Sequence, residues 1–126
     1  MKGILINMNQ RQFLGKKGEN LACSFLVKNN YNIIEKNFRC KQGEVDIIAM
    51  DLSDKDLVFV EVKTRSNFNF GRPSEAVNYS KQKHILDVAQ FYIYINQLQN
   101  LSIRFDIIEV FIEDFYFKIN HIKQAF

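Results

Sequence analysis

The stretch GEVDIIAM at residues 43–50, followed by LVFVEVK at residues 57–63, decides the fold. Both runs are rich in Val and Ile, and the polar stretch 51–56 between them predicts a β-hairpin. Each run is apolar on both of its pleat faces, so we expect these two strands to be central in a sheet that is covered on both sides. The hairpin therefore predicts a layered fold with helices packed on the sheet.

Two amphipathic helices are expected to cover that sheet. The first spans about residues 9–28, where apolar side chains recur on one helical arc, and Asn29 ends it. The second is expected to begin at Ser80 as N-cap, with Ser74 as the alternative, and to run to about residue 98. Both helices need the sheet to bury their apolar stripes.

The remaining β-rich segments complete the layout. Their alternating and β-branched patterns predict strands before the hairpin and after the second helix. The element order is then α-β-β-β-α-β-β, a mixed β-sheet flanked by helices in the α/β class. The expected strands cover residues 31–38, 44–50, 57–63, 103–111 and 115–122.

Length and composition point to one globular domain. The chain has 126 residues, of which 47% are hydrophobic and 25% charged, values typical of a folded domain. We expect residues 1–126 to form a single domain, with residues 1–8 as a disordered N-terminal segment. The formal net charge of +3 does not by itself establish nucleic-acid binding.

The location of the protein is predicted from what its sequence lacks. It contains no apolar run of the ~20 residues that a membrane helix needs, and no signal-peptide core. Cys23 and Cys40 are isolated from each other in the sequence, which suits a reduced environment better than a disulfide scaffold. We therefore expect a cytoplasmic protein that does not engage a membrane.

Three ionisable residues interrupt the apolar hairpin strands: Asp46, Glu61 and Lys63. An ionised carboxylate that is buried without a partner costs several kcal/mol or more. Two facing carboxylates also repel, unless a proton or a metal lies between them. Mg²⁺, or Mn²⁺ in its place, takes hard oxygen ligands of this kind. The pattern therefore predicts a divalent-metal site on the hairpin.

The metal hypothesis requires either the strand register that puts Asp46 opposite Glu61 or one shifted from it by two residues. Alternation puts Glu61 and Lys63 on the same face of their strand. If Asp46 lies opposite Glu61, then Asp51 lies opposite Asp56 and a four-residue turn joins the strands. A slip of one residue would send Asp46 to the other face of the sheet.

A purely structural ion pair is the alternative explanation for these charges. Asp46 would then pair with Lys63, and Glu61 would contact Arg39 or Arg65. The spacing favours the metal site, because fourteen residues separate Asp46 from a Glu-x-Lys sequence on the adjoining strand.

The combined motifs resemble the YraN family of uncharacterised bacterial proteins. These motifs are GEVDIIA (43–49), LVFVEVKTR (57–65) and FGRPSEAV (70–77), and the similarity extends from Gly15 to about Val110. That family belongs to the PD-(D/E)XK, restriction-endonuclease-like superfamily, which also includes archaeal Holliday junction resolvases. Val45-Asp46 replaces the usual Pro-Asp. The resemblance implies a restriction-endonuclease-like sheet and metal-dependent hydrolysis of DNA phosphodiesters, in branched or damaged DNA during repair or recombination.

The resemblance also implies a role for each matching residue. Asp46 and Glu61 would bind the metal together with the backbone carbonyl of Val62. Lys63 would orient or deprotonate the attacking water and offset charge on the scissile phosphate. Glu19, on the first helix, resembles the additional acidic residue of resolvase-like members, with an ordinary surface glutamate as the alternative.

DNA is the partner that the resemblance implies. Basic residues after the hairpin would contact the sugar-phosphate backbone with little sequence specificity, the alternative being a solvated basic cluster. A homodimer and a repair or recombination protein are further expected partners. A nuclease-fold binding module with little or no catalysis is the alternative function. The expected DNA-binding residues are Arg65, Arg72, Lys81 and Lys83.

Overall fold

The computed structural model describes residues 2–65 and 78–126, with side chains described from residue 12 onward. It confirms the predicted α/β class and element order. The elements are α1 (Lys2–Lys28), β1 (Tyr31–Cys40), β2 (Gly43–Asp51), β3 (Asp56–Arg65), α2 (Tyr79–Ile95), β4 (Ser102–Ile112) and β5 (Phe117–Ile122).

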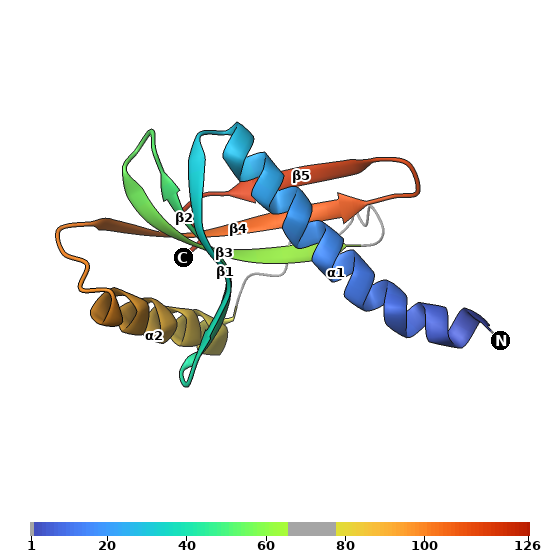
Figure 1. Cartoon of the computed structure of the whole chain (residues 1–126), viewed down its shortest axis with the longest axis horizontal. Helices are drawn as coiled ribbons and strands as arrows, with labels where there is room; N and C mark the ends of the chain where they lie inside the picture. Colours follow the sequence, from blue (N-terminus) through green and yellow to red (C-terminus); the bar gives the residue numbers. More distant parts are fainter. Residues whose placement is uncertain (1, 66–77) are drawn as a thin grey trace.

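The five strands form one mixed sheet in the order β1-β2-β3-β4-β5. Strands β3 and β4 are parallel, whereas the other neighbouring pairs are antiparallel. The parallel pair is possible because α2 lies between β3 and β4 in the sequence and makes the long crossover that such a pair needs. Figure 1 shows α1 crossing the sheet over β3 and β4, with α2 away from it at the lower left.

The two helices cover opposite faces of the sheet, as the alternation of buried residues shows. Val58 and Val60 of β3 belong to the apolar cluster that includes residues of α1. Leu57 and Phe59 belong to the cluster that includes residues of α2. These four residues are each at most 1% exposed, so the expectation of hairpin strands covered on both sides is confirmed.

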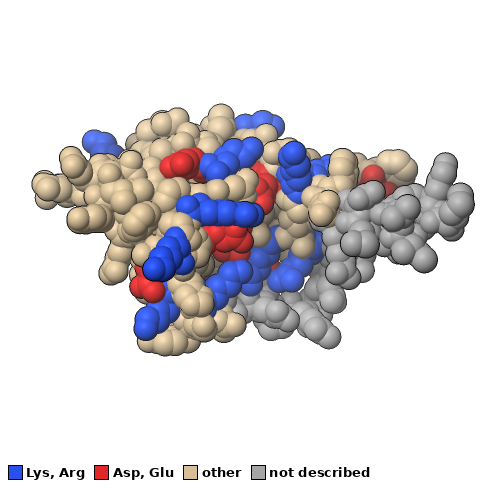
Figure 2. Space-filling model, turned by 60° about the horizontal axis from the view of Figure 1, so that its bottom comes forward, with Lys and Arg blue, Asp and Glu red and all other residues tan. Residues whose placement is uncertain are grey.

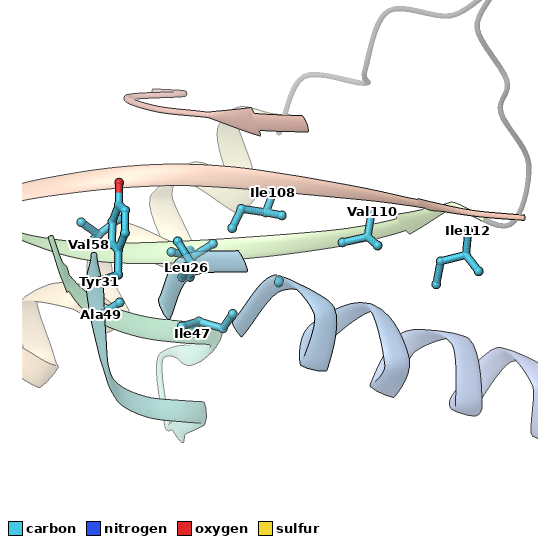
Figure 3. Close-up of a cluster of buried hydrophobic side chains, with 10 residues drawn as sticks. Leu26, Tyr31, Ile47, Ala49, Val58, Ile108, Val110 and Ile112 are labelled. Atoms are coloured by element: carbon cyan, nitrogen blue, oxygen red, sulfur yellow. The ribbon is translucent and has the colours of Figure 1, made fainter. Parts of the chain in front are cut away.

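The α1 face of the sheet carries the larger apolar cluster. Ala22 and Leu26 of α1 are fully buried in this cluster. Figure 3 shows Leu26 among Ile47, Ile108 and their neighbours. Burying a leucine or isoleucine side chain contributes roughly 1.5–3 kcal/mol. This packing holds α1 against β3, and so determines how close Glu19 comes to the hairpin.

Several predicted boundaries differ from those of the structure, and α2 ends at Ile95 and not near residue 98. The N-cap of α2 is Asn78, not Ser80: its side-chain oxygen accepts a hydrogen bond from the backbone N–H of Lys81 at 2.8 Å. The alternative cap, Ser74, lies outside the described residues. Strand β5 begins at Phe117, not at residue 115, because Glu113 N–H donates to the carbonyl of Tyr116 and extends the turn. Helix α1 begins at Lys2, earlier than the expected residue 9.

Across residues 2–65 and 78–126, no helix is both long and apolar enough to cross a membrane.

Candidate metal centre

The β2–β3 hairpin has the register that the metal hypothesis requires. Asp51 pairs with Asp56, and the ladder continues without a slip to the pair Ile47 and Val60. One further step in the same register puts Asp46 opposite Glu61. The register prediction is therefore confirmed over all the paired residues.

The Asp46 carboxylate is anchored where this ladder ends. Its Oδ2 accepts a hydrogen bond from the backbone N–H of Val62 at 2.7 Å. The carboxylate therefore contacts β3 directly, between Glu61 and Lys63 in sequence. Such a bond restrains the side chain, because an N–H group that donates to a carboxylate makes a strong hydrogen bond.

The electrostatic surroundings of Asp46 oppose its ionisation. Burial raises the pKa of Asp46, and the negative charge of Glu61 raises it further, to about 7. Glu19 acts in the same direction, while the Val62 N–H and Lys81 lower the pKa. Glu61 and Glu19 therefore both lie close enough to Asp46 for their charges to oppose its ionisation, as neighbouring carboxylates would at a site for a cation.

Lys81 supplies a positive charge to this group. Its Nζ lies 2.9 Å from Oε1 of Glu61, whose side chain is only 12% exposed. Lys81 is in the first turn of α2, where the Asn78 cap holds its backbone N–H. The two arginines considered as partners for Glu61 pair with other carboxylates. Arg39 pairs with Glu44 at 2.9 Å, and Arg65 lies 3.7 Å from Glu109.

Lys63 lies on the same face of β3 as Glu61 and is close to several other charged side chains. Burial lowers the pKa of Lys63, and the charges of Arg65 and Lys81 lower it further. The charges of Glu109 and Glu61 act in the opposite direction. Lys63 is therefore part of the same electrostatic cluster as the carboxylates.

Glu19 reaches the cluster because α1 packs closely on β3. At Gly18, a Cβ atom would lie 3.0 Å from both Cβ and Cγ2 of Thr64, and closer still to its Oγ1. Only a residue without a side chain fits at this contact. Glu19 follows directly and is partly buried, which confirms its expected position at the border of the buried stripe.

The predicted DNA-contacting residues lie in different surroundings. Lys83 is exposed on α2, Arg65 is partly buried at the end of β3, and Lys81 pairs with Glu61. Arg72 lies outside the described residues. Figure 2 shows Lys and Arg side chains gathered across one face of the molecule, with acidic side chains between them.

The family of the chain follows from comparison with known proteins. Residues 18–110 match the model of "Uncharacterised protein family UPF0102", a span that includes Glu19, Asp46, Glu61 and Lys63. The chain belongs to this family. UPF0102 is the YraN group, which is similar to Holliday junction resolvases, so the resemblance seen in the motifs is confirmed.

Full-length relatives agree with the family match. A UPF0102 protein of Caldicellulosiruptor bescii is 51% identical over 122 residues, covering 94% of this chain and 100% of the relative. A UPF0102 protein of Clostridium botulinum is 48% identical over 115 residues, covering 90% and 93% of the two chains. This chain therefore spans nearly the whole length of these UPF0102 relatives.

A second acidic group in this UPF0102 chain was not identified from the sequence. Among the residues whose side chains are described, Asp51, Asp54 and Asp56 form the one set of three potential ligands with atoms within 4.8 Å of one another. The guanidinium of Arg104 donates to all three, at 2.9, 3.4 and 3.1 Å. Arg104 thus already pairs with all three carboxylates, which makes them part of an ion network.

The residues around Asp46 suit a divalent ion better. Asp46 and Glu61 offer carboxylate oxygens, the hard ligands that Mg²⁺ and Mn²⁺ take. Their mutual repulsion and burial are relieved by a cation, because the charged forms then become favourable. The donor set therefore fits the ion that the family resemblance implies.

Gly18→Ala is expected to destabilise the UPF0102 chain by about 1–3 kcal/mol, because the new methyl group must displace Thr64 or move α1 off β3. Chemical denaturation measures this change. Gly15→Ala is the matched control on the same helix: a Cβ there meets nothing within 4 Å, so it should gain about 0.5–1 kcal/mol from helix propensity. Equal effects at the two glycines would refute the close contact.

Proposed function

We propose that this UPF0102 chain is a divalent-metal-dependent DNA endonuclease of the PD-(D/E)XK type. The observation that carries the proposal is the register of the β2–β3 hairpin, which brings Asp46 to Glu61 with Lys63 on the same face of β3. Burying these charges costs free energy, and binding a cation and a polyanion at the site would explain why the protein retains them.

The chain's own residues divide the work at such a site. Asp46 and Glu61, together with the Val62 carbonyl, would hold Mg²⁺ or Mn²⁺, which when bound offsets negative charge on a phosphodiester. Lys63 would orient the attacking water, or accept a proton from it as the neutral amine, and in its charged form would offset negative charge on the scissile phosphate. Glu19, whose charge already acts on Asp46, would complete the acidic side of the site.

The basic residues around the site support a nucleic acid as the substrate. Arg65 and Lys81 flank the carboxylates, and Lys83 is exposed on the same helix as Lys81. Cations in such positions bind phosphates of any sequence and release counterions on binding. Binding is therefore expected to weaken steeply with salt, and the structure of the DNA would matter more than its sequence.

The direct test uses the purified protein with labelled junction, flap, single-stranded and duplex DNA. We expect cleavage of at least one of these substrates that requires Mg²⁺ or Mn²⁺ and disappears in EDTA. Asp46→Ala is the control for a contaminating nuclease. Equal cleavage, or none at all, by the wild type and this variant on every substrate would exclude the enzyme.

The ion pair between Lys81 and Glu61 favours a second candidate function. At 2.9 Å, Lys81 Nζ already supplies a cation to one of the two proposed metal ligands. In a DNA-binding module with little or no catalysis, this lysine would make a metal unnecessary. The two functions differ in whether Lys81 competes with a divalent ion.

Lys81→Met is expected to tighten Mg²⁺ binding by about threefold to tenfold if the site binds metal, because a positive charge beside Glu61 repels a second cation. Isothermal titration calorimetry measures the dissociation constant. Lys83→Met removes the same charge from an exposed position on α2 and should change it by less than about twofold. Absence of Mg²⁺ binding in all three proteins would favour the binding module.

A further inference from the structure

Glu109 on β4 is a buried carboxylate at 3% exposure, and the roles proposed above do not use it. The other buried charged residues among the described side chains are Asp51, Arg104 and Asp106, and these three form one hydrogen-bonded network. Glu109 has different partners. The cost of burying a charged carboxylate must be offset by nearby positive charges or hydrogen-bond donors, so the neighbours of Glu109 indicate its role.

Glu109 stands in the middle of a row of polar residues that crosses three strands. Its register partner on the parallel strand β3 is Lys63, and its partner on the antiparallel strand β5 is Asn120. Register partners in a sheet point to the same face, so the three side chains share the face that carries Glu61. The row therefore leads from the edge strand into the candidate metal centre.

The two oxygens of Glu109 are directed differently. Asn120 Nδ2 donates to Oε1 at 2.9 Å, while Arg65 Nη2 lies 3.7 Å from Oε2. The amide of Asn120 thus holds the carboxylate from the β5 side. This leaves its negative charge directed toward the cations of β3.

Those cations need a counter-charge. Lys63 lies near both Arg65 and Lys81, whose charges act against its own. Glu61 is engaged by Lys81 at 2.9 Å. Glu109 is the register partner of Lys63 and lies 3.7 Å from Arg65, so it is placed to hold these two cations side by side despite their repulsion.

We propose that Glu109 is a positioning residue, which holds the Lys63 ammonium beside the carboxylates of the metal centre and keeps Arg65 next to it. The inference rests on the proposed function, since it assigns Lys63 a substrate to act upon. It adds a residue of β4 to a site otherwise built on β2 and β3, and Asn120 on β5 holds that residue in place.

Glu109→Gln tests this positioning, because it keeps the shape and the acceptor for Asn120 but removes the charge. We expect kcat for DNA cleavage to fall about 10- to 100-fold, with KM and the Mg²⁺ dissociation constant within twofold of the wild type. Glu109→Asp, which retains the charge, should recover part of kcat. Asp114→Asn removes a charge from the exposed β4–β5 turn and should have no effect. Wild-type kcat in Glu109→Gln, or a parallel loss of Mg²⁺ affinity, would overturn the proposal.

A double-mutant cycle tests whether Glu109 and Lys63 interact, and it does not require that the protein cleave DNA. The effects of Glu109→Gln and Lys63→Met on the unfolding equilibrium constant should be non-additive by about threefold or more, as for residues in contact. If Glu109→Gln does not fold alone, adding Lys63→Met should restore folding, because it removes the charge that Glu109 balances. Additive effects, or failure to fold in both backgrounds, would refute the positioning role. If no DNA is cleaved by the wild type, the proposed function fails, and the cycle still decides the contact.

Discussion

Asp46→Asn is expected to abolish metal-dependent cleavage and, at the same time, to make the metal-free protein more stable. Activity should fall at least about 10³-fold, because a neutral amide neither holds a divalent ion well nor completes the charge arrangement of the site. Stability should rise by about 1–3 kcal/mol at pH 8, because the substitution removes a carboxylate that burial and Glu61 disfavour. The amide oxygen can still accept the hydrogen bond from Val62.

The stability gain has a defined pH dependence. The pKa of Asp46 is about 7 in the folded protein, above its value of about 3.9 in an unfolded chain. The folded state therefore holds the proton more tightly, and this contribution to stability is complete below about pH 4. It is lost as the pH rises through about 7. The metal-free wild type should lose Tm over this range relative to Asp46→Asn, by several degrees in total.

Differential scanning fluorimetry in EDTA and in Mg²⁺, at pH 5 and pH 8, separates these effects. Mg²⁺ should raise the Tm of the wild type at pH 8 and leave that of Asp46→Asn unchanged. Glu44→Gln is the control on the same strand, since Glu44 is exposed and pairs with Arg39 at the surface. If Mg²⁺ shifts the Tm of the wild type and Asp46→Asn equally, the ion binds elsewhere and the site is refuted.

The sequence was sufficient for the hairpin and its register because local rules determine both. Val and Ile on both pleat faces mark central strands, and the short polar turn leaves few ways to pair Asp51 with Asp56. The resulting opposition of Asp46 and Glu61 needs no knowledge of the rest of the fold. The border position of Glu19 was likewise predictable from the period of its helix.

The contacts that the sequence did not reveal join residues that are far apart in the chain. Arg104 donates to Asp51, 53 residues away, and to Tyr31, 73 residues away. Such pairs depend on the β3–β4 crossover, which periodicity alone does not place. The pairing of Lys81 with Glu61 depends in turn on how α2 begins, and that start was wrongly assigned to Ser80. A visible signal was present, because Arg104 and Asp106 interrupt an apolar strand as Asp46 does.

Arg104→Met is expected to cost about 3–5 kcal/mol of folding free energy, the largest loss that we expect of any single change. The arginine is 4% exposed and donates to Asp106 at 2.9 and 3.0 Å, to Asp51 at 2.9 Å and to Tyr31 at 2.6 Å. Its removal leaves Asp51 with a buried negative charge and no cation. Methionine fills a similar volume, so the loss reports charge more than packing.

The pH dependence of this loss identifies its cause. Burial opposes ionisation of Asp51, but hydrogen bonds from Arg104 and from the N–H groups of Asp54 and Ser53 outweigh it and lower the pKa of Asp51 to about 2. A depressed pKa contributes stability above about pH 3.9 that is lost as the pH falls toward 2. The gap between the wild type and Arg104→Met should therefore narrow in acid.

Urea denaturation at pH 7, 4 and 2.5 measures the difference in unfolding free energy between the wild type and Arg104→Met. Arg39→Met is the matched control: its side chain is 77% exposed and pairs with Glu44 at 2.9 Å, so it should cost under about 1 kcal/mol at every pH. Because Arg104 lies at the turn end of the hairpin and Asp46 at the other, folded Arg104→Met should bind Mg²⁺ like the wild type. A loss below about 1 kcal/mol, or a gap that does not change with pH, would mean that the carboxylates do not depend on Arg104.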